Sequence, residues 1–433
     1  MTIVLVAGPA DDPIPLWFPA GPLQRPASMN PPHPDADLVV AGVHPLTLAT
    51  VCGAAFISAL SFFAATPFFP EMAEDLDTTV PVLGQTSTLL MVVSALLGLG
   101  VGPVGDAYGY RRMLTVGVLA IAAYQLGFAL APSFPLLLAV TLLGAFGDAI
   151  VFGLALTLAS VLFHGAGRRR AIGWAIASFN ISAILGVPIL TFVGDRQGWR
   201  FAIGSFGLAT LAFVWMIVAV LPADQRRPAA RLRLREVAAS FAPLFADPPS
   251  LRLLGGTVMR AMWILGLVTY FGAFLADELG LSTRNVGLMY MLAGTGATVG
   301  SVAAGTRVVG SSPRTTVALT SLAGGALLGV IIGSSSAVVT ATLIPVMSAL
   351  AAIASVGITT LLAAESPAQP GTTMALNASL LNIGGGLGAA VGGVLIALGG
   401  FPAFAIGLPV FAVAGGILVW WPSKVRTVAP GPA

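Results

Sequence analysis

Residues 102–112 read Gly-Pro-Val-Gly-Asp-Ala-Tyr-Gly-Tyr-Arg-Arg, a cluster of charge and glycine in sequence that is otherwise almost uncharged. Apolar blocks of roughly 20 residues flank this cluster, and a helix of that length crosses about 30 Å of hydrocarbon. Of the 433 residues, 57% are hydrophobic and only 9% are charged, and the mean hydropathy is +0.94. These values exclude an ordinary soluble chain and predict an integral membrane protein built from helices.

Twelve apolar blocks follow one another, six on each side of a basic connector. They lie at 46–69, 81–104, 113–131, 135–162, 171–194, 200–221, 253–276, 285–306, 315–333, 338–363, 371–398 and 401–421. The predicted fold class is therefore an all-α membrane protein with twelve transmembrane helices in two pseudo-symmetric six-helix bundles. The predicted parts are a Pro-rich disordered cytoplasmic tail at 1–43, bundles at 44–221 and 253–422, the connector at 222–252 and a cytoplasmic tail at 423–433. Translation can start at Met1 or at Met29 within the first tail.

Basic residues are divided unequally between alternate loops. Arg196, Arg200 and Arg284 fall on one side and Arg260 lies within a span, which leaves 16 of the 20 basic residues for the other side. Because basic loops are retained in the cytoplasm, both termini are predicted to be cytoplasmic in a multi-pass protein of the cytoplasmic (inner) membrane. The arginine-rich second part of the connector is predicted to form a short helix on the inner leaflet.

The two halves of the sequence also resemble each other. The fifth span places Asn180 six residues before Gly186, and the eleventh places Asn382 six residues before Gly388. Together with the six-plus-six layout, this match favours two repeats, a construction that allows a transporter to rock about a central site.

The loop between the second and third spans resembles the signature of the major facilitator superfamily, carried here by Gly102, Asp106, Gly109, Arg111 and Arg112. The resemblance covers about residues 44–422 and implies a cytoplasmic gating element in this loop. The glycines let the chain turn sharply, and Asp106 can accept hydrogen bonds from arginines or from a helix N-terminus. A role of the two arginines in orientation alone is the alternative.

A second motif, with Gly186, Pro188 and Gly194, resembles the fifth-helix glycine–proline motif of exporters in the arabinose-efflux-permease-like and twelve-span drug:proton antiporter branch. Pro188 is expected to bend its helix at the seam between the halves. The chain departs from that branch at Val140 or Thr141, where an arginine often stands. The loop between the eighth and ninth spans is basic but has no acid, so the predicted charge lock is stronger in the first half.

Asp148 and Arg260 are the two charged residues that the sequence places well inside spans, where charge is costly. We hypothesise that Asp148 is the protonatable coupling residue and that Arg260 modulates its protonation or binds an anionic group. The alternatives are a static salt bridge between the two, or an Arg260 side chain that extends to the membrane surface. Further candidates for contact with a substrate in the cavity are Ser61, Asn180, Trp263, Tyr270 and Asn382.

The predicted function is secondary active transport, with export of a small organic compound (a drug-like molecule, a sugar or a metabolite) in exchange for protons. An uptake symporter or facilitator of the same fold, and a non-transporting membrane receptor or scaffold, are the alternatives. The single Cys52 and three scattered histidines predict no metal site and no cofactor, and no catalytic constellation suggests an enzyme. The expected partners of this monomer are its substrate, protons and membrane lipid, without nucleic acid.

Overall fold

The computed structural model describes residues 45–163, 165–223, 234–304, 312–334, 336–368 and 370–421. The predicted tails and the beginning of the connector lie outside these residues. All the described residues belong to one compact unit, Val43–Ala433, so the boundaries of the two predicted bundles stay a prediction. The helices before residue 224 are called the first half, and those after residue 233 the second half.

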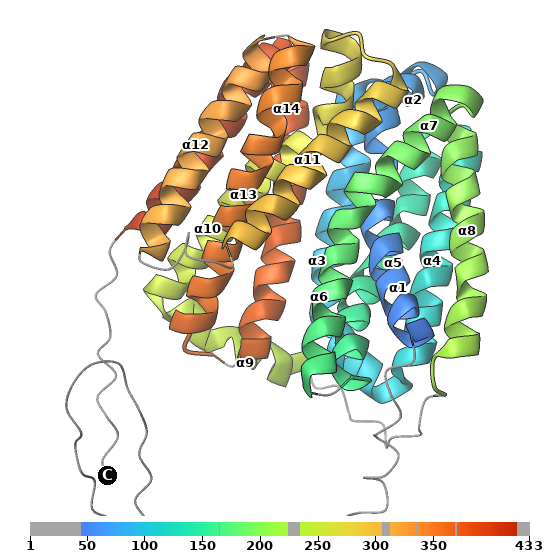
Figure 1. Cartoon of the computed structure of the whole chain (residues 1–433), viewed down its shortest axis with the longest axis vertical. Helices are drawn as coiled ribbons and strands as arrows, with labels where there is room; N and C mark the ends of the chain where they lie inside the picture. Colours follow the sequence, from blue (N-terminus) through green and yellow to red (C-terminus); the bar gives the residue numbers. More distant parts are fainter. Residues whose placement is uncertain are drawn as a thin grey trace, which may run out of the picture. The chain divides into compact units, whose positions relative to one another are not determined.

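The helices of the first half run back and forth between the same two ends of the bundle (Figure 1). They are α1 (Pro45–Phe63), the 3₁₀ turn η2 (Thr66–Phe68), α2 (Phe69–Asp75), α3 (Val80–Tyr108), α4 (Tyr110–Leu130), α5 (Phe134–Val161), α6 (Gly165–Ile181), the π-helical η3 (Ser182–Gly186), α7 (Val187–Gln197) and α8 (Trp199–Val220).

The second half opens with the short helix expected in the connector and continues with long apolar helices. Its elements are α9 (Leu234–Ala246), α10 (Pro248–Ala273), the π-helical η4 (Phe274–Glu278), α11 (Thr283–Ala303), α12 (Pro313–Ser334), α13 (Ala337–Glu365) and α14 (Pro370–Trp420). Asp247 caps α10 by accepting a 3.0 Å hydrogen bond from the Ser250 amide, so this helix begins five residues before the predicted span.

Eleven helical stretches of the described residues are long and apolar enough to cross a membrane. The last, Thr372–Trp420, has 49 residues and a helical length of roughly 70 Å, more than twice the hydrocarbon thickness. Within α14, Gly399 and Gly400 have non-helical backbone angles, and Gly400 has a φ of 65°, which glycine adopts without a steric penalty. Because α14 therefore crosses twice, the prediction of twelve spans is confirmed.

The two ends of the bundle differ in charge. One end carries Glu74, Asp75, Asp195, Asp277 and Glu278 and is called the acidic end. The opposite end is called the arginine end, because Arg111, Arg168 and Arg314 lie there at the beginnings of their helices. The helices between these ends follow the alternating order predicted from the sequence.

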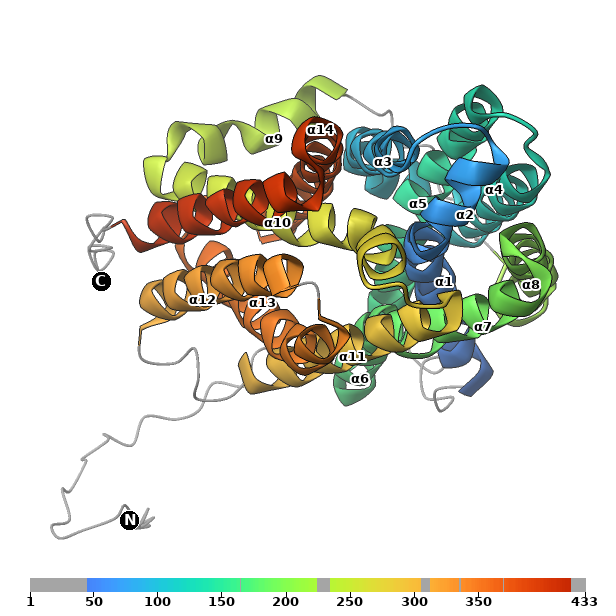
Figure 2. The same cartoon turned by 90° about the horizontal axis from the view of Figure 1, so that it is seen from above.

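The two halves meet along two pairs of helices, α3 with α14 and α7 with α11, which lie side by side in Figure 2. Thr88 on α3 donates a 3.2 Å hydrogen bond to the carbonyl oxygen of Gly386 on α14. Nearer the acidic end, the hydroxyl groups of Thr66 and Tyr290 lie 3.1 Å apart. These hydrogen bonds link the halves through neutral groups.

A π-helical turn interrupts the fifth span at Ser182–Gly186 and ends two residues before Pro188. Proline has no amide hydrogen and its ring clashes with the carbonyl group four residues earlier, so a regular helix cannot continue through it. One additional residue in the turn accommodates the proline. The irregularity that the sequence predicts at Pro188 therefore lies in the turn before it.

Candidate functional site

Gly109 forms the sharp corner between α3 and α4. Its φ is 94° and its amide donates a 2.9 Å hydrogen bond to the carbonyl oxygen of Gly105. Gly102 and Asp106 lie in the last two turns of α3. The side chain of Asp106 is outside the described part of the chain, so its hydrogen bonds remain a prediction.

Arg111, in the first turn of α4, contacts the last helix of the first half. Its Nη2 atom donates a 2.5 Å hydrogen bond to the carbonyl oxygen of Val218, in the last turn of α8. The last carbonyl groups of a helix lack partners within the helix and carry its negative partial charge. Arg111 therefore ties the last helix of its half to the corner at Gly109, whereas Arg112 is exposed.

The second half repeats this contact. Arg314, at the beginning of α12, donates a 3.0 Å hydrogen bond to the carbonyl oxygen of Val419, at the end of α14. Arg314 also forms an ion pair with Glu365, the last residue of α13. The loop between the eighth and ninth spans has no acid, as its sequence shows, but Arg314 finds one on a different helix, so the second half does not lack a charged partner.

Asp148 lies in the middle of α5 and is half-buried. Its Oδ1 atom accepts a hydrogen bond from the hydroxyl group of Ser58 on α1, which is 1% exposed. The ring of Tyr124 on α4 covers Gly144, one helical turn before Asp148 on the same face of α5, where a Cβ atom would lie 2.7 Å from the ring. The carboxyl group thus lies at a junction of helices within the first half.

Arg260 lies on α10 in the second half, and no ion pair joins it to Asp148 among the described residues. Its Nε atom is buried and has no hydrogen-bond partner in the described part of the chain. The indole nitrogen of Trp263, three residues further along α10, is likewise buried without a described partner. The structure therefore leaves two buried donors together on one helix and does not join Arg260 to Asp148.

The residues of the glycine–proline motif pack where α1 and α11 meet the fifth span. A Cβ atom at Gly186 would lie 2.8 Å from the side chain of Leu60 on α1. The backbone of Pro188 lies against Gly287 of α11, where a Cβ atom would be 3.0 Å from the proline Cα. Gly194 is covered by the ring of Phe68. Gly186 and Gly194 thus pack against other elements of the first half, whereas Pro188 packs against the second half.

The remaining predicted residues lie in different environments. Ser61 is buried in α1, and Asn180 and Asn382 are half-buried on α6 and α14. Trp263 is fully buried and packs toward Gly324 of α12. The structure does not bring these side chains together around one point, and their contact with a substrate remains a prediction.

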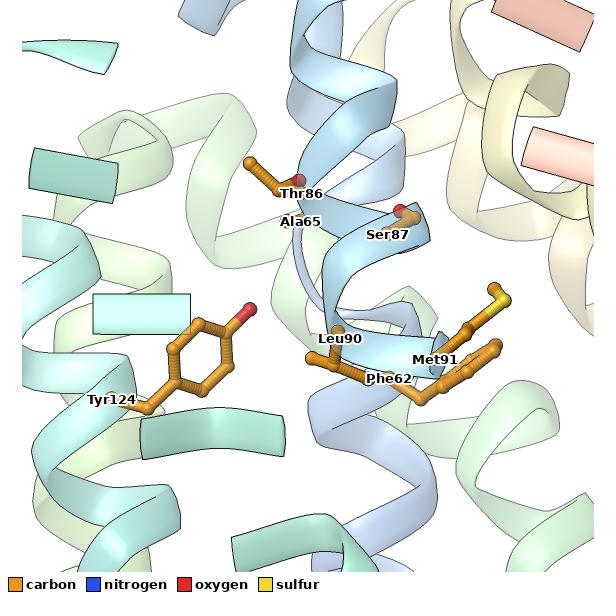
Figure 3. Close-up of a pocket in the computed structure, with 7 residues that line it drawn as sticks. All are labelled: Phe62, Ala65, Thr86, Ser87, Leu90, Met91 and Tyr124. Atoms are coloured by element: carbon orange, nitrogen blue, oxygen red, sulfur yellow. The ribbon is translucent and has the colours of Figure 1, made fainter. Parts of the chain in front are cut away.

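A small cavity of about 10 Å³, enough for one water molecule, lies between α1, α3 and α4 (Figure 3). Its lining residues are Phe62, Ala65, Thr86, Ser87, Leu90, Met91 and Tyr124. Thr86, Ser87 and Met91 were not candidates from the sequence, because small polar and apolar side chains inside a span carry no distinctive pattern.

A polar cluster joins several loops at the acidic end. The side chain of Asp75 accepts 3.1 Å hydrogen bonds from the Trp199 indole and from the Arg200 Nε atom. Arg200 also donates to the carbonyl oxygen of Ala131, at 2.8 Å. This cluster lies within the first half and was not predicted, because its members are far apart in the sequence.

Twelve crossings, two halves that repeat an arginine cap, and a half-buried acid within the bundle define a polytopic membrane protein of the transporter class. A family model of the Major Facilitator Superfamily matches residues 51–388. The chain therefore belongs to this superfamily, as the loop around Gly109 suggested. Proteins of this family are transporters rather than enzymes.

The chain also resembles a drug-resistance protein in sequence and solved transporter structures in fold. A chloramphenicol resistance protein of Streptomyces lividans is 27% identical over 268 residues, which are 60% of this chain and 66% of that relative. A bacterial homologue of the human lysosomal transporter Spinster, in an inward-facing and unoccupied conformation, matches with a TM-score of 0.67 and 15% identity over 87% of this chain and 95% of that one. The occupied form matches with a TM-score of 0.65 and 16% identity, over the same shares of the two chains. At these identities the structural likeness concerns the fold alone.

Proposed function

We propose that this transporter exports a small organic compound in exchange for protons, with Asp148 as the residue that binds the proton. The observation that carries the proposal is the half-buried Asp148 carboxyl group with its hydrogen bond from Ser58. Placing an acid in the middle of a membrane span costs free energy, and an acid at such a position is therefore a candidate for a functional residue. A neutral hydroxyl partner leaves the carboxyl group able to gain and lose a proton, whereas a fixed arginine partner would favour the charged form at all times.

The name of the Streptomyces lividans relative favours an antibiotic-like compound as the substrate. The glycine–proline motif at Gly186 and Pro188 favours export over uptake. We propose that Arg260 contributes by binding an electron-rich or anionic group of the compound, because its buried Nε atom has no partner among the described residues and a buried donor without a partner is costly.

We further propose that the protein lies in the cytoplasmic (inner) membrane as a monomer, with both termini in the cytoplasm. In this orientation the arginine end faces the cytoplasm and the acidic end faces outward. The support is the excess of basic residues in alternate loops, since arginine-rich loops are retained on the cytoplasmic side.

The test is transport by the purified protein in proteoliposomes with an imposed pH gradient, with chloramphenicol as the first probe and a panel of sugars, amino acids and cationic drugs after it. Probe accumulation and internal pH are followed together. We expect Asp148→Asn to abolish accumulation that the pH gradient drives, because its side chain binds no proton in this range. Exchange of labelled probe without a gradient should persist.

Asp195→Asn is the matched control, because it removes an exposed carboxyl group at the acidic end and should leave accumulation unchanged. Full gradient-driven accumulation in Asp148→Asn would refute the coupling role. Proton flux in the same direction as the probe would instead identify an uptake symporter. Absence of proton and probe movement for every compound would favour a receptor or scaffold.

A further inference from the structure

Tyr270 is an almost fully enclosed side chain with a polar tip at the seam between the halves. It lies near the acidic end of α10 and is 1% exposed. Its hydroxyl group donates a 2.9 Å hydrogen bond to the carbonyl oxygen of Ala389 on α14. Its ring packs edge-on against Phe404, with the centroids 5.9 Å apart. These contacts hold the side chain firmly within the second half.

The other side of the Tyr270 ring faces the first half through a glycine. A Cβ atom at Gly84 of α3 would lie 2.7 Å from ring atom Cε1 and closer still to the hydroxyl oxygen. Carbon atoms in ordinary contact are about 3.5–4.0 Å apart, so only glycine allows α3 to approach this closely. Gly393 of α14 borders the same hydroxyl group, 2.5 Å from where its Cβ atom would be. Gly84 and Gly393 thus form a socket around the tip of Tyr270, with one wall from each half.

Two further contacts close the same end of the seam. The backbone of Gly272, two residues beyond Tyr270, touches Pro67 of the 3₁₀ turn η2, so that a Cβ atom there would lie 2.7 Å from the proline Cα. Thr283 at the beginning of α11 donates a 2.5 Å hydrogen bond to Glu71 on α2. The acidic end is therefore closed by direct contact in this conformation, and the Tyr270 socket is one of three contacts that close it.

We propose that Tyr270 and Gly84 form the latch that closes the acidic end of the transport pathway. When the halves separate at this end, Tyr270 stays with α14 through Ala389 and Phe404, and the Gly84 face of α3 withdraws from the ring. A side chain at position 84 prevents the ring from seating and so favours the conformation open at the acidic end. This role holds whichever compound is moved and whether or not protons are exchanged.

The test measures the distance between the two halves at the acidic end by double electron–electron resonance. Spin labels are attached at the exposed positions Thr79 and Glu278, each changed to cysteine, in the full chain with Cys52→Ser. We expect Gly84→Ala to shift the ratio of long to short distances at least tenfold toward the long, open distances, because overfilling a packed contact is strongly unfavourable. Gly98→Ala, on the same helix with nothing within 4 Å of a new Cβ atom, should leave the distribution unchanged.

Tyr270→Leu provides a second variant, because it empties the socket instead of overfilling it. Combined with Gly84→Ala, it makes room for the alanine, so the double variant should be at least threefold less open than Gly84→Ala alone. A distance distribution for Gly84→Ala equal to that of Gly98→Ala would overturn the proposal. A double variant as open as Gly84→Ala would also overturn it, since the clash with the ring would then not be the cause. These distances are independent of transport activity, so the failure of the proton-coupling proposal would leave this test intact.

Discussion

Replacing Gly300 by alanine tests whether the second half depends on the close contact between α11 and α13. Gly296 and Gly300 lie four residues apart on one face of α11, an arrangement that lets two membrane helices approach closely. A Cβ atom at Gly300 would lie 2.6 Å from the Cα atom of Ala349 on α13, and one at Gly296 would lie 2.5 Å from the Cα atom of Pro345. Backbone atoms obstruct both positions, so no side chain can rotate away to relieve the clash.

The size of the effect follows from two opposing contributions. Alanine in place of glycine within a helix raises the free energy of unfolding by about 0.5–1 kcal/mol, because the unfolded chain loses conformational freedom. Overfilling a packed contact costs about 1–3 kcal/mol. Gly153 of α5 provides the matched control, because nothing lies within 4 Å of a Cβ atom there. The difference between Gly300→Ala and Gly153→Ala cancels the first contribution and leaves about 1–3 kcal/mol.

The assay is reversible unfolding of the full chain in mixed micelles with increasing denaturing detergent, monitored by the loss of helical signal. A difference of about 1–3 kcal/mol corresponds to roughly a 5- to 150-fold change in the unfolding equilibrium constant. Gly300→Ala should unfold at a lower detergent fraction than the parent chain, and Gly153→Ala at an equal or higher fraction. Equal midpoints for the two variants would show that α11 and α13 adjust without cost, and would refute the argument from backbone contact.

Two further outcomes concern the arginine end. Gly109→Ala should lower the free energy of unfolding by about 1–3 kcal/mol, because the backbone at Gly109, with φ at 94°, is in a region that favours glycine. The control is Gly100→Ala, at an unobstructed position on α3. A thermal midpoint for Gly109→Ala no lower than that of Gly100→Ala would contradict this expectation. The ion pair of Arg314 with Glu365, whose side chains are 20% and 33% exposed, should show a coupling of about 1 kcal/mol or less in a double-mutant cycle of the two glutamine variants. This coupling should fall with salt, and a coupling well above 1 kcal/mol, or one that does not change with salt, would contradict this expectation.

The sequence predicted the features that follow from composition and local chemistry. The number of spans, the break between Leu398 and Phe401 and the disturbance at Pro188 all follow from apolar length, glycine and proline. These properties act over a few residues, so a single sequence contains them. The superfamily was likewise suggested by one short loop, because the glycines and charges of that loop are rare inside membrane sequence.

Contacts between distant positions could not be predicted in this way. Asp148 was recognised as costly, but its partner Ser58 is 90 positions away and resembles many other serines and threonines in the spans. Gly84 is one of 52 glycines, and only the position of the Tyr270 ring distinguishes it. The acid that pairs with Arg314 was missed for the same reason, since Glu365 belongs to another helix.

The two kinds of contact in this molecule suit two rigid halves that move against each other. Within each half, an arginine at the arginine end holds the carbonyl end of the last helix, Arg111 on Val218 and Arg314 on Val419. Between the halves, the seam is formed mostly by van der Waals contacts at glycines and by hydrogen bonds of neutral hydroxyl groups, with the hydrogen bond from Thr283 to the Glu71 carboxyl group as an exception at the acidic end. Charged hydrogen bonds are the stronger class and break less readily, whereas contacts at glycines form without rearrangement of side chains. This division of contacts meets the requirement of a transporter built from two repeats, in which each half keeps its own structure when the seam between them opens.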